Sequence, residues 1–218
     1  LAGGSQLSAE DLAWLRGLAV TLRIAKREKA DKMSDPVELR QVIDKALYKL
    51  DVIPPGLVLG QAAYESGYGT SRFAVKGNAL FGQWTYGGKG MQPREKRASK
   101  GDYAVAAYDW PLDSVRDYMR NLNTHRAYQG LRDKRAAARA DGRMPTGAEL
   151  AEALTRYSEK GAEYVKTLQS IMRINELALA DRATLQAAPA ILLIDVPGEE
   201  EVAKLKSEIA ALRETGEL

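Results

Sequence analysis

The segment from residue 57 to residue 82, LVLGQAAYESGYGTSRFAVKGNALFG, constrains the fold most, because it fixes where a helix ends and places an acid at that end. The Pro54-Pro55 pair suits the first turn of a helix, and Leu57, Gln61, Ala62 and Glu65 recur at helical spacing. Gly67 and Gly69 then favour termination. The sequence therefore predicts a helix that carries Glu65 in its last turn.

The predicted position of Glu65 indicates a carboxylic acid whose pKa is raised above the ordinary value for glutamate. The last turn of a helix has the negative end of the macrodipole and unpaired carbonyl groups, and both disfavour a carboxylate anion. Desolvation by neighbouring aromatic side chains, such as Tyr64 and Tyr68, would raise the pKa of Glu65 in the same direction. Cleavage of a glycosidic bond needs such a protonated acid. An exposed glutamate without a function is the competing interpretation.

Three separate blocks of the sequence occur in the order found in one enzyme family. QAAYESGYGTSRFAVKGNALFGQW combines an Ala- and Gln-rich helix, ending in Glu-Ser-Gly-aromatic-Gly, with a later Asn-x-Leu-Phe-Gly. The blocks YDWPLDSVRDYMRNLNTHRAYQGLR and TRYSEKGAEYVKTLQSIM follow. Over about residues 36–182 the chain resembles the glucosaminidases of glycoside hydrolase family 73, and within that family their Bax-like branch.

This resemblance implies both a fold and an activity. The fold would be mainly α, a lysozyme-like helical domain with a small β-hairpin lobe. The activity would be that of an endo-β-N-acetylglucosaminidase, a peptidoglycan hydrolase that cleaves the β-1,4 bond after N-acetylglucosamine with Glu65 as general acid. Its partners would be the glycan strands of the bacterial cell wall, so we expect an exported protein of the periplasm or cell envelope.

Residues 83–109 are the one segment that does not favour helix, because glycines mark a turn and apolar residues then alternate. We expect a small antiparallel hairpin or sheet that forms one lip of the substrate groove. Trp84 and Tyr86 are candidates to stack on sugar rings, although burial suits Trp84 nearly as well. Tyr68, Asn78 and Tyr164 complete the predicted substrate-binding set. For Asn78, bracing the turn beneath Glu65 is better supported than contact with a sugar.

The second catalytic group has two alternatives. Glu95 could activate water, but it lies between Arg94 and Lys96, where an ion-paired surface role is at least as well supported. Otherwise the 2-acetamido oxygen of the substrate attacks the anomeric carbon, and no protein nucleophile is needed. The resemblance implies that Tyr157 faces the catalytic acid. Tyr164 lies seven residues later, and we expect both tyrosines on one helix face.

Composition removes several other classes of function. The chain has no Cys and one His, which argues against disulfides, thiolate chemistry and His-rich metal sites, so we expect neither a metal nor a cofactor. The net charge of +3 comes without a basic stripe of interleaved aromatics, and we expect no nucleic acid partner. A lytic transglycosylase or muramidase-type enzyme and a non-catalytic peptidoglycan-binding protein are the alternative functions. No signal peptide or membrane-spanning run is visible, so we expect the export signal or anchor outside this chain.

Three parts are predicted along the chain. Residues 1–35 form an N-terminal helical extension, capped by Ser8 and helical to about Ala30. Residues 36–182 form the catalytic domain, with the β lobe at about 83–109. Residues 183–218 form a C-terminal tail.

The elements at the two edges of the catalytic domain and in the tail are also predicted. The domain starts with a helix through Leu50 and closes with a helix over 149–180 that breaks near Gly161. In the tail, residues 191–196 have strand character, and 199–212 form a helix. We expect this helix to pack on the body; a partner or dimer contact is the minority interpretation.

Overall fold

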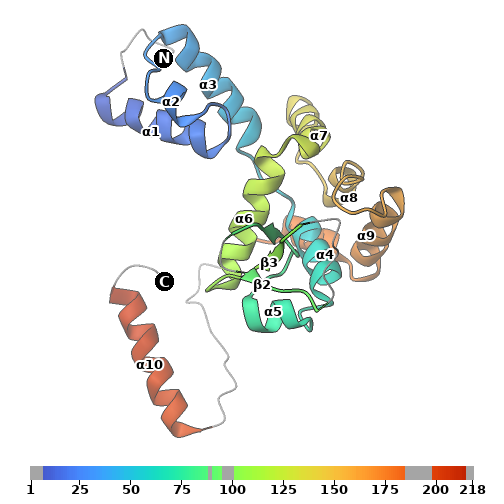
Figure 1. Ribbon diagram of the computed structural model, residues 1–218. Helices are drawn as coiled ribbons and strands as arrows, with labels where there is room; N and C mark the ends of the chain where they lie inside the picture. Colours follow the sequence, from blue (N-terminus) through green and yellow to red (C-terminus); the bar gives the residue numbers. More distant parts are fainter. Residues whose placement is uncertain (1–6, 88–89, 95–100, 185–197, 215–218) are drawn as a thin grey trace. The chain divides into compact units, whose positions relative to one another are not determined.

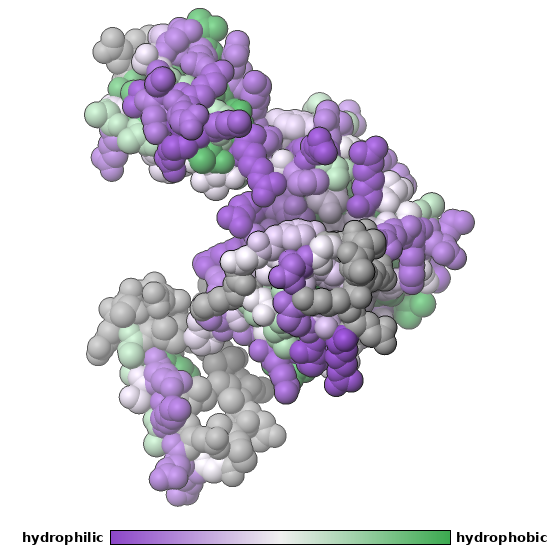
Figure 2. Space-filling model, viewed as in Figure 1, coloured by the Kyte–Doolittle hydropathy of each residue, from purple (hydrophilic) through white to green (hydrophobic). Residues whose placement is uncertain are grey.

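The computed structural model describes residues 7–87, 90–94, 101–184 and 198–214. They belong to two compact units, Leu1–Ala183 and Thr184–Leu218. The first unit is mainly α with a small antiparallel sheet, which confirms the predicted fold class (Figure 1). The face in Figure 2 is mostly polar, with small and separate apolar areas. Within the described ranges, no helix has both the length and the apolar character that crossing a membrane requires.

The N-terminal helices α1 (Ala9–Thr21), α2 (Arg27–Ala30) and α3 (Pro36–Lys49) form a small helical layer. Ser8 caps α1 by accepting a hydrogen bond from the Asp11 backbone N–H at 3.0 Å, as predicted. The helix expected up to Ala30 is interrupted, because Arg23 adopts a left-handed φ of 53°. Side chains of α1 and α3 share one hydrophobic cluster, formed by Leu15, Ala19, Met33, Leu39 and Val42.

The body of the first unit surrounds α4 (Pro55–Ser66). The helices that follow are α5 (Arg72–Gly77), α6 (Pro111–Thr124), α7 (Gln129–Ala140), α8 (Gly147–Ala151) and α9 (Ala162–Ile174), with the short 3-10 helices η2 (Arg126–Tyr128) and η3 (Leu177–Arg182). Their main core contains Leu57, Phe81, Tyr118, Leu122, Leu150, Leu154, Tyr164 and Leu168.

The β lobe is a three-stranded antiparallel sheet in the order β1-β3-β2. Its strands are β1 (Trp84–Thr85), β2 (Gly90–Met91) and β3 (Ala104–Ala106). Val105 of the central strand lies opposite both Trp84 and Met91. The sheet therefore agrees with the lobe predicted at 83–109.

The closing helix was predicted too long. α8 ends at Ala151 and α9 begins at Ala162, so Tyr157 lies in the turns between them. These turns are closed by short-range backbone hydrogen bonds, and Gly161 takes a left-handed φ of 56°. The idea that Tyr157 and Tyr164 share a helix face is therefore wrong.

The second unit contains α10 (Glu199–Glu214), which confirms the predicted tail helix. The strand predicted at residues 191–196 lies outside the described residues. The predicted domain boundaries stay a prediction. The division between the compact units falls after Ala183, and α3, assigned to the catalytic domain, packs in the same cluster as α1.

A buried arginine joins the N-terminal helices to the body. Arg135 of α7 is only 1% exposed, and its guanidinium donates to the Tyr48 and Lys49 carbonyls at the end of α3. It also donates to the carbonyls of Asp51 and Val52 and to Asn123 Oδ1 on α6. These bonds satisfy carbonyl groups that a helix end leaves without partners.

Replacing Arg135 should therefore destabilise the first unit strongly. We expect Arg135→Met to lower the free energy of unfolding by about 3 kcal/mol, because buried carbonyls lose a charged donor. The control Arg116→Met removes an exposed arginine whose partner is Asp113 at 3.4 Å, and should change stability by no more than about 0.5 kcal/mol. Urea denaturation of both variants measures the change in the free energy of unfolding. Equal changes in Arg135→Met and Arg116→Met would contradict the stabilising role of Arg135.

Candidate active site

The end of α4 is built as the sequence predicts. Gly67, Tyr68 and Gly69 follow one another with left-handed φ values of 59°, 54° and 79°. The Ser66 hydroxyl accepts a hydrogen bond from the Gly69 backbone N–H at 2.7 Å. It donates one to the Ala62 carbonyl, one helical turn earlier. The chain therefore leaves the helix abruptly after Ser66, the residue that follows Glu65.

Glu65 is partly buried, and this burial raises the pKa of its carboxyl group. A hydrogen bond from the Tyr164 hydroxyl and the charge of Lys160 act in the opposite direction, because both favour the carboxylate. On one side the carboxyl faces Gly82, where an added Cβ atom would lie 3.8 Å from Glu65 Oε2. The direction of the pKa shift agrees with the sequence prediction. Of the two aromatic neighbours named there, Tyr68 is 64% exposed.

A chain of hydrogen bonds between buried side chains leads to Glu65. The Tyr118 hydroxyl donates to Gln61 Oε1 at 2.5 Å, and Gln61 Nε2 donates to the Tyr164 hydroxyl at 2.8 Å. Because Tyr164 receives a hydrogen bond from Gln61, its own proton is free to point at Glu65. Gln61 was not among the predicted site residues. Its position one helical turn before the acid was the signal that could have found it.

Tyr157 lies close enough to Glu65 for the charge of that carboxyl group to act on it, and its role beside the acid stays a prediction. Its hydroxyl donates to the Phe81 carbonyl at 3.3 Å, whereas Tyr164 makes the hydrogen bond to Glu65. Its ring stacks on the ring of Tyr164 with a centroid distance of 5.6 Å. Burial raises the pKa of the Tyr157 hydroxyl far above its usual range, so this group stays protonated.

The predicted substrate-binding residues fall into two groups. Trp84 is 45% exposed and stacks on Tyr103 at 4.5 Å, and Tyr86 is 67% exposed, so both rings have surface accessible to a ligand. Asn78 instead braces the lobe, because its side-chain amide donates to the backbone carbonyls of Tyr108 and Asp109 at 3.1 and 3.0 Å. Glu95 lies outside the described residues.

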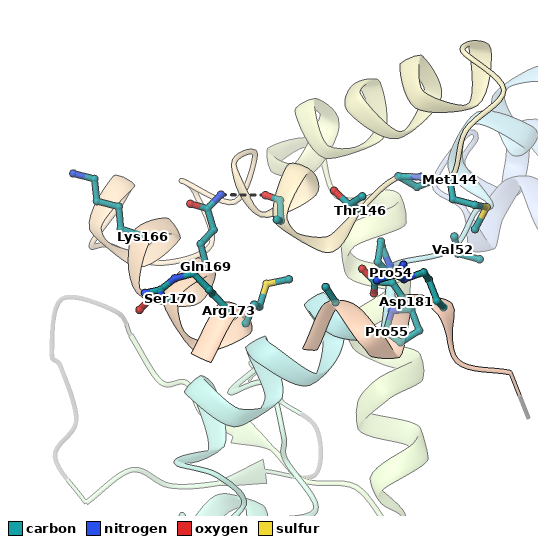
Figure 3. Close-up of a pocket in the computed structure, with 15 residues that line it drawn as sticks. Val52, Pro54, Pro55, Met144, Thr146, Lys166, Gln169, Ser170, Arg173 and Asp181 are labelled. Carbon is teal, nitrogen blue, oxygen red and sulfur yellow. Dashed lines mark hydrogen bonds between the residues drawn. The ribbon is translucent and has the colours of Figure 1, made fainter. Parts of the chain in front are cut away.

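A cavity of about 1130 Å³ lies at the other end of α4, away from Glu65 (Figure 3). Its wall is mostly apolar and includes Pro54 and Pro55, and Gln169 on its rim donates to the Ala148 carbonyl at 3.1 Å. Glu65 is not among the residues that line this cavity. Over the described part of the chain, no group of three or more His, Asp or Glu side chains is arranged to bind a metal ion.

Comparison with known proteins identifies the family. The glucosaminidase family model, described as mannosyl-glycoprotein endo-beta-N-acetylglucosaminidase, matches residues 41–177, well over half of the chain. The chain belongs to the glucosaminidase family. It is also similar to Protein bax of Escherichia coli (strain K12), with 34% identity over 134 residues, covering 62% of this chain and 47% of that protein.

These matches confirm the predicted resemblance, and they include Glu65 and the residues that surround it. The chain spans about half the length of the curated relative it matches. No solved structure matches the chain.

The raised pKa of Glu65 has a consequence for stability that does not depend on function. Between the ordinary glutamate value and the raised one, the folded protein holds a proton that the unfolded chain releases. The stability of the wild type therefore falls as pH rises through this window. Glu65→Gln lacks the titrating group, so we expect its stability relative to the wild type to be higher at pH 7 than at pH 4.

Urea denaturation at both pH values measures this difference. Glu163→Gln, at an exposed position in the first turn of α9, is the matched control and should show no comparable change between the two pH values. A stability difference for Glu65→Gln that stays constant or shrinks toward neutral pH would contradict the assignment.

Proposed function

We propose that this protein is a peptidoglycan hydrolase, an endo-β-N-acetylglucosaminidase that cleaves the β-1,4 bond after N-acetylglucosamine. The observation that carries the proposal is Glu65 itself. It is a partly buried acid with a raised pKa, at an abrupt helix end, within the segment that matches the glucosaminidase family. On this proposal the protein works outside the cytoplasmic membrane, where its substrate lies.

Glu65 acts as the general acid. In its protonated form it donates to the glycosidic oxygen as the bond to the anomeric carbon breaks, and the leaving sugar departs as a neutral alcohol. The transfer leaves a carboxylate in a partly buried site. Tyr164 donates a hydrogen bond to that anion, and Lys160 adds a favourable charge. Gln61 and Tyr118 are positioning residues, because they fix which way the Tyr164 proton points.

The second half of the reaction follows one of the two routes predicted from the sequence. Either Glu95 activates the attacking water, which inverts the anomeric configuration, or the substrate acetamido oxygen attacks first and configuration is retained. A muramidase-type lytic transglycosylase would use the same acid, but the 6-hydroxyl of N-acetylmuramic acid would be the nucleophile.

Glu65→Gln should abolish cleavage while glycan binding remains. Glutamine keeps the shape of the side chain but has no proton to give, and general acid catalysis contributes roughly 10²–10⁴-fold. Mass spectrometry of sugars released from purified peptidoglycan is the measurement. Reducing N-acetylglucosamine ends support the proposal, anhydro-muramyl ends point to the transglycosylase, and residual turnover above about a tenth of wild type would remove Glu65 from the acid role.

The pH dependence of turnover should respond to Tyr164. Activity is expected to fall as pH rises through the raised pKa of Glu65, because the acid must be protonated. The Tyr164 hydrogen bond favours the carboxylate, so Tyr164→Phe should raise this pKa further and move the alkaline limb of kcat to higher pH.

Tyr157→Phe is the matched control for that shift. It removes a neighbouring tyrosine hydroxyl whose hydrogen bond goes to the Phe81 carbonyl rather than to Glu65. Its alkaline limb should stay in place. A limb that moves to lower pH in Tyr164→Phe, or equally in both variants, would show that Tyr164 does not tune the acid.

A further inference from the structure

A small polar pocket lies beside the β lobe, between the N-terminal helices and α6. It has a volume of about 200 Å³ and is lined by Arg23, Gln83, Trp84, Asp117, Arg120 and Asn121. Arg23 comes from the connection after α1, outside residues 41–177 that match the family. The pocket therefore combines residues inside the family match with one residue outside it.

The pocket adjoins the surroundings of Glu65. Gln83 directly follows Gly82, the residue that faces the Glu65 carboxyl. On the α6 side, Asn121 hydrogen bonds to the hydroxyl of Tyr128, whose ring centroid lies 5.8 Å from that of Tyr157. On both sides, residues that line the pocket are therefore direct neighbours of residues that lie near Glu65.

The charges of the pocket leave it with a positive character. Its one carboxylate, Asp117, is fully engaged: Oδ2 accepts from Gln83 Nε2 at 3.0 Å and from the Tyr108 hydroxyl at 2.9 Å. Oδ1 of the same group accepts from Arg120 at 2.5 Å, which neutralises this pair. The guanidinium of Arg23 makes no ion pair or hydrogen bond within the ranges that the structure describes, so its charge is available to a ligand.

Trp84 gives the pocket an aromatic wall next to this charge. One side of its indole is covered by Tyr103, while 45% of the residue remains accessible. An aromatic face contacts the apolar face of a sugar ring, and a nearby guanidinium recognises a carboxylate. These two features select a ligand that has both groups on one residue.

We propose that this pocket is a subsite for a sugar residue carrying a carboxylate, with Trp84 against the ring and Arg23 paired with the acid. The inference rests on the proposed function, and it adds which sugar of the strand lies here. In peptidoglycan that residue is N-acetylmuramic acid. Its anion is either the free lactyl carboxylate of denuded strands or a carboxylate of the attached peptide.

Binding by full-length Glu65→Gln, which cannot turn the substrate over, tests the subsite. Calorimetry would compare tetrasaccharides of three kinds: denuded peptidoglycan, peptide-bearing peptidoglycan and neutral chitin. Adding Arg23→Ala should weaken the binding of at least one carboxylate-bearing ligand roughly tenfold and leave chitin binding unchanged, because only a charged partner uses the guanidinium. Weakening of the denuded ligand identifies the lactyl group, and weakening of the peptide-bearing ligand alone identifies the peptide.

Arg27→Ala is the matched control, because it removes the same charge from an exposed position on α2 that does not line the pocket. It should leave all three affinities in place. Equal weakening of charged and neutral ligands by Arg23→Ala, or no weakening of any, would overturn the subsite while the proposed function stands. Failure of the parent protein to bind any glycan, together with absent cleavage by the wild type, would overturn both.

Discussion

The arrangement of the first unit depends on one buried guanidinium. Arg135 donates hydrogen bonds to carbonyl groups at the end of α3 and in the short connection before α4. It also donates one to the side chain of Asn123. Water would normally satisfy such carbonyls at a surface, but here the buried side chain of Arg135 takes its place. A buried cation needs several acceptors, and these acceptors need a donor, so each stabilises the other. The start of α4 is thereby fixed.

Close packing against η3 and α9 fixes the course of α4 from its start to Glu65 in its last turn. Asp181 of η3 accepts hydrogen bonds from the backbone N–H groups of Gly56 and Gly147, and so caps α4 and α8 together. Added Cβ atoms at Gly56 and Gly60 would collide with the Leu177 carbonyl and with Met172 of α9. Helix α4 therefore lies directly against the elements that follow Tyr157, and this contact sets the distance between Glu65 and Tyr164.

The parts of this structure that the sequence predicted are those set by local rules. The helix end at Gly67, the cap at Ser8 and the small sheet follow from residue types that act within a few positions. The roles of Arg135 and Gln61 could not be predicted in this way. Each depends on carbonyls or hydroxyls brought from distant segments, and an arginine in a charged, Ala-rich stretch is usually exposed.

The separation of Tyr157 and Tyr164 into different elements has the same origin. Spacing alone suggested one helix face, but the turns between α8 and α9 move Tyr157 beneath Phe81 and leave Tyr164 on α9 to meet the acid. A seven-residue interval predicts a shared face only if the helix is continuous across it. The interruption is encoded in part by Gly161, yet its position relative to Tyr157 depends on the packing of Leu154 in the core.

The balance of forces on Glu65 suits an acid that must give up a proton and then exist as an anion. Burial alone would hold the proton too firmly, because the carboxylate left behind would have no compensation. The Tyr164 hydrogen bond strengthens when the carboxyl group becomes charged, since bonds to ionised acceptors are about twice as strong as neutral ones. The relay through Gln61 keeps this donor aimed at Glu65 before the transfer begins. In the proposed reaction, stabilisation would therefore become larger as charge develops on Glu65, and this would lower the barrier to proton transfer rather than the energy of the resting acid.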